Sequence, residues 1–166
     1  MGKKKKWKQP TEELVWIWVG NKDHHVDKIA RVLGLYLGKK YKLRSLFVDG
    51  LNIQETKDFI EELRSDKSRR FQFIAVDVGL CKQNTLMLRV DGGIKPASGI
   101  KEQDIELGDV SYIINIDNVY KHVKDKTPTE CLLENYTDYK VQKKVNKIIC
   151  RLYHKLDTTL QALGGE

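Results

Sequence analysis

Two aspartates stand where a pair of carboxylates could carry out acid–base chemistry. Asp27 comes seven residues after Gly20, and Asp77 directly follows the apolar segment 71–76. Two carboxyl groups that lie close together can share a proton, hold a metal ion or orient a water molecule. Each aspartate also has a structural interpretation, because the helix dipole favours Asp27 near a helix start and Asp77 before Val-Gly is a common turn residue.

Two histidines stand beside the first aspartate. His24 and His25 precede Asp27, and histidine together with aspartate suits zinc, nickel or manganese. Adjacent histidines cannot both face one centre from a strand or a helix, which weakens this interpretation. His24 and His25 are therefore candidate metal ligands in one alternative, with a divalent metal at Asp27 and Asp77, while the other alternative has no cofactor.

Hydrophobic periodicity predicts the elements that must position these residues. The segment 14–19 is a continuous apolar run of the kind found in fully buried parallel strands, and the segment 71–76 is predicted to be a further strand. The segments 24–37 and 54–63 carry apolar side chains at steps of three and four, which predicts amphipathic helices, the first of them ending at Gly38. Further strands are predicted over 41–48, 85–90 and 110–114.

A start signal precedes the C-terminal helical region. Thr127 suits the cap position, Pro128 the first helical position and Glu130 the third position of a capping box. An apolar stripe then continues to Gly164-Gly165, with a break expected near Thr137-Asp138. The order β-α-β-α-β-β-β-α predicts an α/β fold with a mostly parallel sheet and helices on both faces.

This fold would bring the candidate residues together. In an open α/β sheet, ligands bind at the carboxyl ends of the strands. Asp77 ends the strand 71–76, and Asp27 is expected in the first turn of the helix that follows the strand 14–19. If these strands are near neighbours, both carboxyl groups converge on one crevice. We assign Asp27 and Asp77 as catalytic candidates, and Asn21, Lys95 and Ser98 as candidate substrate contacts.

The basic charge is concentrated at the amino terminus. The chain has 166 residues and a formal net charge of +7, and the lysines from Lys3 to Lys8 supply +5 of it. The remaining +2 argues against nucleic acid as the partner, although a basic tail could act as an electrostatic arm. We predict a disordered basic tail over 1–12 and a single α/β domain over 13–166.

Composition argues against several classes of protein. The three cysteines show no CxxC spacing, which argues against a disulfide framework or a cysteine zinc site. No apolar run approaches the roughly 20 residues that a membrane span needs, and no apolar segment follows the first lysines as a secretory signal would require. We therefore expect a cytoplasmic protein without a membrane partner. Its oligomeric state is not indicated.

Several segments in register resemble the YyaC-type sporulation proteins. The match runs from about residue 14 to 156 in the same order and spacing. That family carries a Lys-Pro turn, then Val-Gly-Asp-Ile and a strand that ends in Asn. The corresponding segments here are 50–56, 74–80, 93–100, 107–115 and 133–135.

The resemblance implies a fold and a site. The YyaC-type family is similar to the spore germination protease and the hydrogenase-maturation proteases, which implies a three-layer α/β/α sandwich of the phosphorylase/hydrolase-like kind. In those relatives an acidic residue stands seven positions after the glycine that ends the first strand, and an aspartate ends the strand after the second helix. Asp27 and Asp77 match these positions. The resemblance implies an aspartic-type peptidase centre, or a site that binds the substrate's nickel together with a histidine.

Two departures from the family pattern affect the expected function. The family's Gly-Asp-Ser-Leu-Gly-Pro loop is replaced here by the residues 26–31, and the strand 110–114 offers no histidine. The resemblance therefore implies a sporulation-associated protein with a peptidase-like fold and a degenerate or unknown activity. The alternatives are an aspartic-type or metal-assisted peptidase acting on a spore or maturation substrate, and nucleic-acid binding through the lysine tail.

Overall fold

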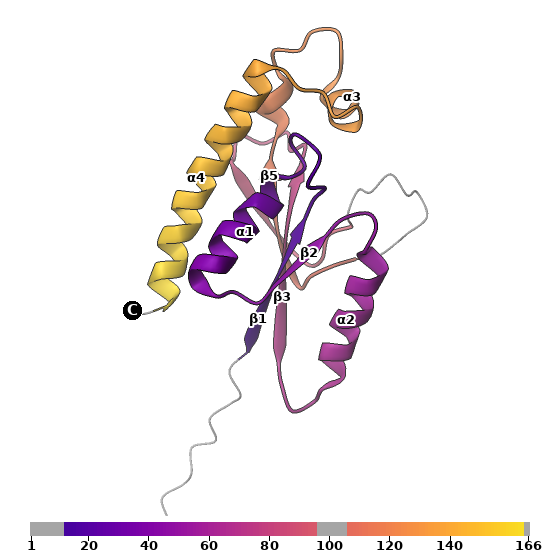
Figure 1. Cartoon of the computed structure of the whole chain (residues 1–166), viewed down its shortest axis with the longest axis vertical. Coiled ribbons are helices and arrows are strands. Elements are labelled where there is room, and N and C mark those ends of the chain that lie inside the picture. The colour runs from indigo at the N-terminus through magenta and orange to yellow at the C-terminus, as the bar shows by residue number, and fades with distance from the viewer. Residues whose placement is uncertain (1–11, 96–105, 165–166) are drawn as a thin grey trace, which may run out of the picture.

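A computed structural model of the chain describes residues 12–95 and 106–164, which contain a five-stranded sheet in the order β2-β1-β3-β5-β4 (Figure 1). Neighbouring strands are parallel, except that β4 runs antiparallel to β5. The strands are β1 Glu13–Val19, β2 Ser45–Val48, β3 Phe71–Gly79, β4 Met87–Asp91 and β5 Val110–Asn115. The helices are α1 Ile29–Tyr41, α2 Ile53–Ser65, α3 Pro128–Leu133 and α4 Tyr139–Gly164, with a 3-10 turn, η1, at Asp117–Tyr120.

The helices cover both faces of the sheet. Figure 1 shows α1 and α4 together on one face and α2 on the other. One apolar cluster joins α1 and α4 to the sheet, and a second cluster joins α2 to the opposite face. The predicted three-layer sandwich with a mostly parallel sheet is therefore confirmed.

Side chains of the central strands alternate between the two apolar clusters. In β1, Trp16 and Trp18 pack in the cluster with α1 and α4, whereas Val15 and Ile17 pack in the cluster with α2. The residues of β3 alternate in the same way. Because both faces are buried over residues 15–19 of β1 and 73–76 of β3, these segments are continuously apolar instead of alternating with polar residues.

The connections place a topological switch point between β1 and β3. The chain leaves β1 through α1 to reach β2 on one side, then returns through α2 to β3 on the other side of β1. The segments that follow β1 and β3 therefore diverge. Pairing between the two strands ends at Trp18 and Val76, immediately before Asp77. Open α/β sheets bind their ligands at such a point, outside the carboxyl ends of the strands.

The first helix begins and ends later than the sequence predicted. Residues 22–28 form turns, so Asp27 precedes α1 and does not lie in its first turn. The predicted stop at Gly38 was also wrong, because the helix continues until Lys42 adopts a left-handed conformation with φ 51°. Gly38 instead lets β2 approach closely, since a Cβ atom there would lie 3.2 Å from Ser45 Oγ.

The start and the break of the C-terminal helical region are confirmed. The Thr127 hydroxyl accepts the N–H of Glu130 at 3.2 Å, which caps α3. The chain then turns through Asn135, which has φ 53°. A second cap starts α4, where Asp138 Oδ1 accepts the N–H of Val141 at 2.7 Å. Two caps in succession explain why one apolar pattern gives two helices.

Parts of two predictions lie outside the described residues. These are the disordered tail, except for Glu12, and the substrate contact assigned to Ser98. Within the predicted domain 13–166, the described strands all belong to the one sheet. None of the described helices is long and apolar enough to cross a membrane.

Candidate functional site

The loop that follows β1 holds Asp27 against the end of that strand. The carbonyl oxygen of Asp27 packs on Gly20, where a Cβ atom would lie 2.1 Å from it. The N–H of Asn21 donates to Asp27 Oδ2 at 2.8 Å, and Asn21 Oδ1 accepts the N–H of Asp23 at 2.9 Å. Asn21, the predicted substrate contact, therefore lies beside Asp27 and fixes one of its carboxylate oxygens.

His24 has a structural role in the same loop. Its Nδ1 accepts the N–H groups of Val26 at 3.1 Å and Asp27 at 2.9 Å, so this nitrogen carries no proton. The ring proton is therefore on Nε2, which donates to the carbonyl oxygen of Leu132 at 2.7 Å. His24 could ligate a metal only by giving up these bonds. Sequence alone missed this role because a histidine that bonds its own loop and a metal-binding histidine can share one local sequence.

The end of α3 closes over this loop. Besides the bond from His24 to Leu132, the N–H of His25 donates to Asn135 Oδ1 at 2.8 Å. Across residues 12–95 and 106–164, no group of three or more His, Cys, Asp or Glu side chains could hold a metal ion. The divalent metal at Asp27 and Asp77, with His24 or His25 as a further ligand, stays a prediction.

Asp77 lies in β3, at the point where β3 stops pairing with β1. Asp77 is 9% exposed, and its Oδ1 accepts the N–H of Val78 at 2.8 Å. Burial raises the pKa of this carboxyl well above its ordinary value, and the negative charge of Asp27 raises it further, against the smaller effect of the Val78 bond. Asp27 lies in the loop that follows β1, and Asp77 follows the last residue of β3 that pairs with β1, so both carboxyl groups lie at the same edge of the sheet.

The pair is suited to acid–base chemistry because its members differ in environment. Asp77 is buried, which favours its protonated form, whereas Asp27 has one oxygen held by a backbone N–H. A buried carboxyl whose raised pKa keeps its proton can act as an acid beside a second carboxyl that acts as a base. Asp77 can give a proton to one reacting atom while Asp27 accepts a proton from another.

Tyr120 is a polar residue of this region that sequence reasoning missed. It is 1% exposed, and its hydroxyl has no hydrogen-bond partner in the described part of the chain. Burial raises the pKa of Tyr120, and the charges of Cys131 and Asp27 raise it further, which keeps the hydroxyl neutral. Buried polar groups are normally bonded, so this one indicates a ligand or water position. No local sequence pattern indicates this role, because a tyrosine after a strand is an ordinary core residue.

Replacing Tyr120 with phenylalanine should stabilise the protein in the absence of a ligand. The free energy of unfolding should rise by about 1 kcal/mol, because the ring keeps its packing and an unsatisfied hydroxyl is removed. Urea unfolding measures the effect. Tyr136→Phe is the matched control, since the Tyr136 hydroxyl donates to Asp138 Oδ2 at 3.0 Å and its loss should destabilise. Equal destabilisation by both substitutions would contradict the assignment of Tyr120.

Asn115 organises the neighbouring loops at the same edge of the sheet. It ends β5 and is 7% exposed. Its Nδ2 donates to the carbonyl oxygens of Gln83 at 2.7 Å and Thr85 at 3.0 Å. Its Oδ1 accepts the N–H groups of Cys81 at 3.3 Å and Asp117 at 3.0 Å. One buried amide therefore ties the segment after β3 to the start of η1 at this edge of the sheet.

Lys95, the remaining predicted substrate contact, lies in the segment that follows β4. Lys95 follows Ile94, which pairs with Leu107 and packs in the apolar cluster with α2. This segment begins at the end of β4, the strand that runs antiparallel to the others. The role assigned to Lys95 therefore stays a prediction.

Two comparisons with known proteins identify no relative of the chain. A scan against protein-family models and a search of curated proteins find no match to the chain. The fold and the site define an α/β sandwich with a carboxylate pair at its switch point. The resemblance to the YyaC-type proteins stays a prediction.

Proposed function

We propose that the crevice between β1 and β3 is the site of a peptidase-like hydrolase, with Asp77 as the acid and Asp27 as the base. The observation that supports this most directly is the raised pKa of the buried Asp77 beside the charge of Asp27. Strongly perturbed carboxyl groups in clefts concentrate at functional sites. The position at the switch point agrees with the usual ligand site of open α/β sheets.

In the proposed reaction, a water molecule between the two carboxyl groups attacks the carbonyl carbon of a peptide bond. Asp27 takes the water proton while Asp77 gives its proton to the carbonyl oxygen. When the C–N bond breaks, Asp27 passes its proton to the leaving nitrogen, and the hydroxyl proton of the intermediate returns to Asp77. Both carboxyl groups are restored, and the N–H of Asn21 keeps Asp27 oriented throughout.

Hydrolysis of a mixed peptide library in isotope-labelled water, read by mass spectrometry, tests this proposal. Asp27→Asn and Asp77→Asn should each lower cleavage by at least about 100-fold, the scale expected for loss of a general acid or base. Asp23→Asn is the matched control, because Asp23 is exposed in the same loop and takes part through its backbone N–H. Absence of cleavage, or equal cleavage by all variants, would contradict the proposal.

A second candidate is a binding protein that keeps this fold without catalysis. The bonding of the β1 loop favours it, because His24 and Asn21 direct their polar atoms into the loop itself. The resemblance implies a protein of this kind, namely a sporulation-associated protein with a peptidase-like fold and a degenerate or unknown activity. Peptide binding without hydrolysis, retained in Asp77→Asn, would favour this candidate over the hydrolase.

A further inference from the structure

A groove of about 440 Å³ lies at the amino-terminal end of β1, at the opposite end of the sheet from Asp77. Leu14 and Trp16 line it from β1, Leu43 from the segment before β2, and Leu160 from α4. Leu14 is 40% exposed near the start of β1, where β2 does not yet pair with this strand. Together with Trp16, Leu43 and Leu160 it forms an apolar lining that another molecule can cover.

The wall of this groove is held in place by α4. The Tyr41 hydroxyl donates to the carbonyl oxygen of Asp157 at 3.0 Å and also bonds the Asp157 carboxylate. Lys40 forms an ion pair with the same carboxylate at 2.6 Å. These contacts join the end of α1 to α4 beside Leu160, so the groove exists before any partner binds.

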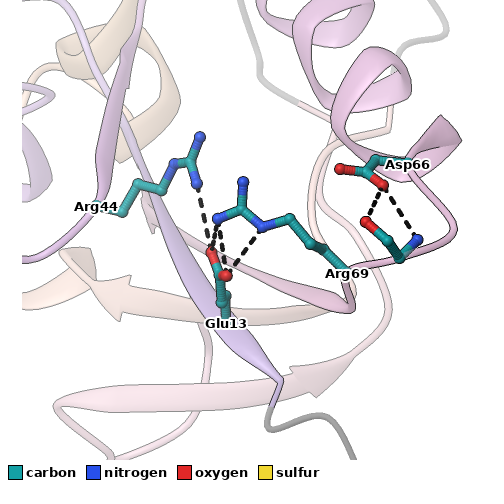
Figure 2. A network of polar contacts seen from close by, with 5 residues as sticks. Glu13, Arg44, Asp66 and Arg69 are labelled. Atoms are coloured by element: carbon teal, nitrogen blue, oxygen red, sulfur yellow. Dashed lines mark hydrogen bonds and ion pairs between the residues drawn. The ribbon is translucent and has the colours of Figure 1, made fainter.

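The rim of the groove is cationic. Figure 2 shows Glu13 between Arg69 and Arg44. Arg69 binds the Glu13 carboxylate at 2.5 to 3.0 Å, whereas Arg44 reaches it through Nη1 alone at 3.5 Å. The charge of Glu13 is therefore matched by Arg69, and Arg44 keeps unused N–H donors. Lys42 also lines the groove and has no ion pair within the described residues.

We propose that this groove is a docking site for an acidic protein segment that carries an apolar side chain. The apolar side chain would cover Leu14 and Trp16, and carboxylates beside it would pair with Lys42 and Arg44. The chain's own tail and a second copy are disfavoured as occupants, because the tail carries five lysines and the whole chain has a net charge of +7. The site is separate from the crevice, so it does not depend on the hydrolase proposal.

Fluorescence anisotropy with labelled peptides tests the docking site in the full chain. The probes are Glu-Asp-Leu-Phe-Asp-Glu, the same peptide with alanine in place of Leu and Phe, and a single-stranded thymidine oligonucleotide. Lys42→Glu should weaken binding of the first peptide by about tenfold, and Leu14→Ser should remove most of its advantage over the alanine peptide. Lys124→Glu is the matched control, because it changes the net charge equally on an exposed lysine between η1 and α3 and should change binding less than about twofold.

Three results would overturn the docking site. The first is binding of the apolar peptide that neither Lys42→Glu nor Leu14→Ser weakens. The second is binding that disappears on deletion of residues 1–8 but survives both substitutions, which would assign it to the lysine tail. The third is equal or tighter binding of the oligonucleotide, which would identify a nucleic-acid surface instead.

Discussion

Asp77→Asn should make the protein more stable at neutral pH, although it removes the central carboxyl of the crevice. The asparagine has the same shape, but it cannot ionise inside the fold beside Asp27. We expect the free energy of unfolding to rise by about 1 to 3 kcal/mol, the range for an uncompensated buried polar group. A substitution that stabilises the fold and abolishes activity is characteristic of a functional residue. Denaturant unfolding at neutral pH measures the change.

The pH dependence of this effect has a defined sign. The folded-state pKa of Asp77 lies above the value of 3.8 that an unperturbed Asp has. Between these two values the folded state binds a proton that the unfolded state has released, so wild-type stability falls as pH rises through this window. The asparagine variant does not lose stability in this way. The difference in the free energy of unfolding between the variant and the wild type should therefore be small near pH 4, where the unfolded carboxyl is about half protonated, and should grow toward neutral pH.

Asp109→Asn is the control for Asp77→Asn, because we expect it to lower the stability of the protein instead of raising it. Asp109 Oδ2 accepts the N–H of Phe73 at 2.9 Å, and its Oδ1 pairs with Arg64 at 2.6 Å. This ionised carboxylate supports the fold, so its replacement should lower stability by about 1 kcal/mol at neutral pH. If Asp77→Asn also destabilises, Asp77 is a structural residue and the acid–base assignment of the crevice is wrong.

Most of the fold follows from local sequence because the buried strands and helices differ in period. The run 14–19 predicts a strand, which is buried on both faces from Val15 to Val19, and the cap at Thr127 predicts the start of a helix. The start of α1 could not be placed, because buried Val26 continues the helical pattern while its N–H bonds to the His24 ring. Periodicity records which side chains are buried, and it does not record where their backbone groups are bonded.

The candidate site was predictable to the extent that topology determines it. Strand order brings Asp77 to the switch point, and the loop after a strand end brings Asp27 to the same edge. The role of His24 depends on Leu132, which is 108 residues away, and no local pattern encodes that contact. Tyr120 was missed for the same reason, since the burial of its hydroxyl exists only once η1 and α3 have packed in one apolar cluster.

Gly34→Ala should destabilise the protein by about 2 to 4 kcal/mol. A Cβ atom at position 34 would lie 2.3 to 2.6 Å from three atoms of the Trp18 ring. The ring cannot move aside, because Trp18 is fully buried, stacks on Trp16 with centroids 5.4 Å apart, and donates its Nε1–H to Ser45 Oγ at 3.1 Å. The cost of overpacking should exceed the gain of about 1 kcal/mol that alanine brings to a helix. The melting temperature should fall by roughly 5 to 15 °C.

Gly38→Ala separates this contact from helix propensity. Gly38 lies one turn further along the same helix, and its Cβ would lie 3.2 Å from Ser45 Oγ, a contact that a shift of a few tenths of an ångström relieves while the bond from Trp18 to Ser45 is kept. The two variants share the same gain in helix propensity, so the difference between them measures the contact with the Trp18 ring. We expect Gly38→Ala to remain within about 1 kcal/mol of the wild type. Similar losses in both variants would mean that α1 does not lie on Trp18, and the position of the loop that carries Asp27 would be wrong with it.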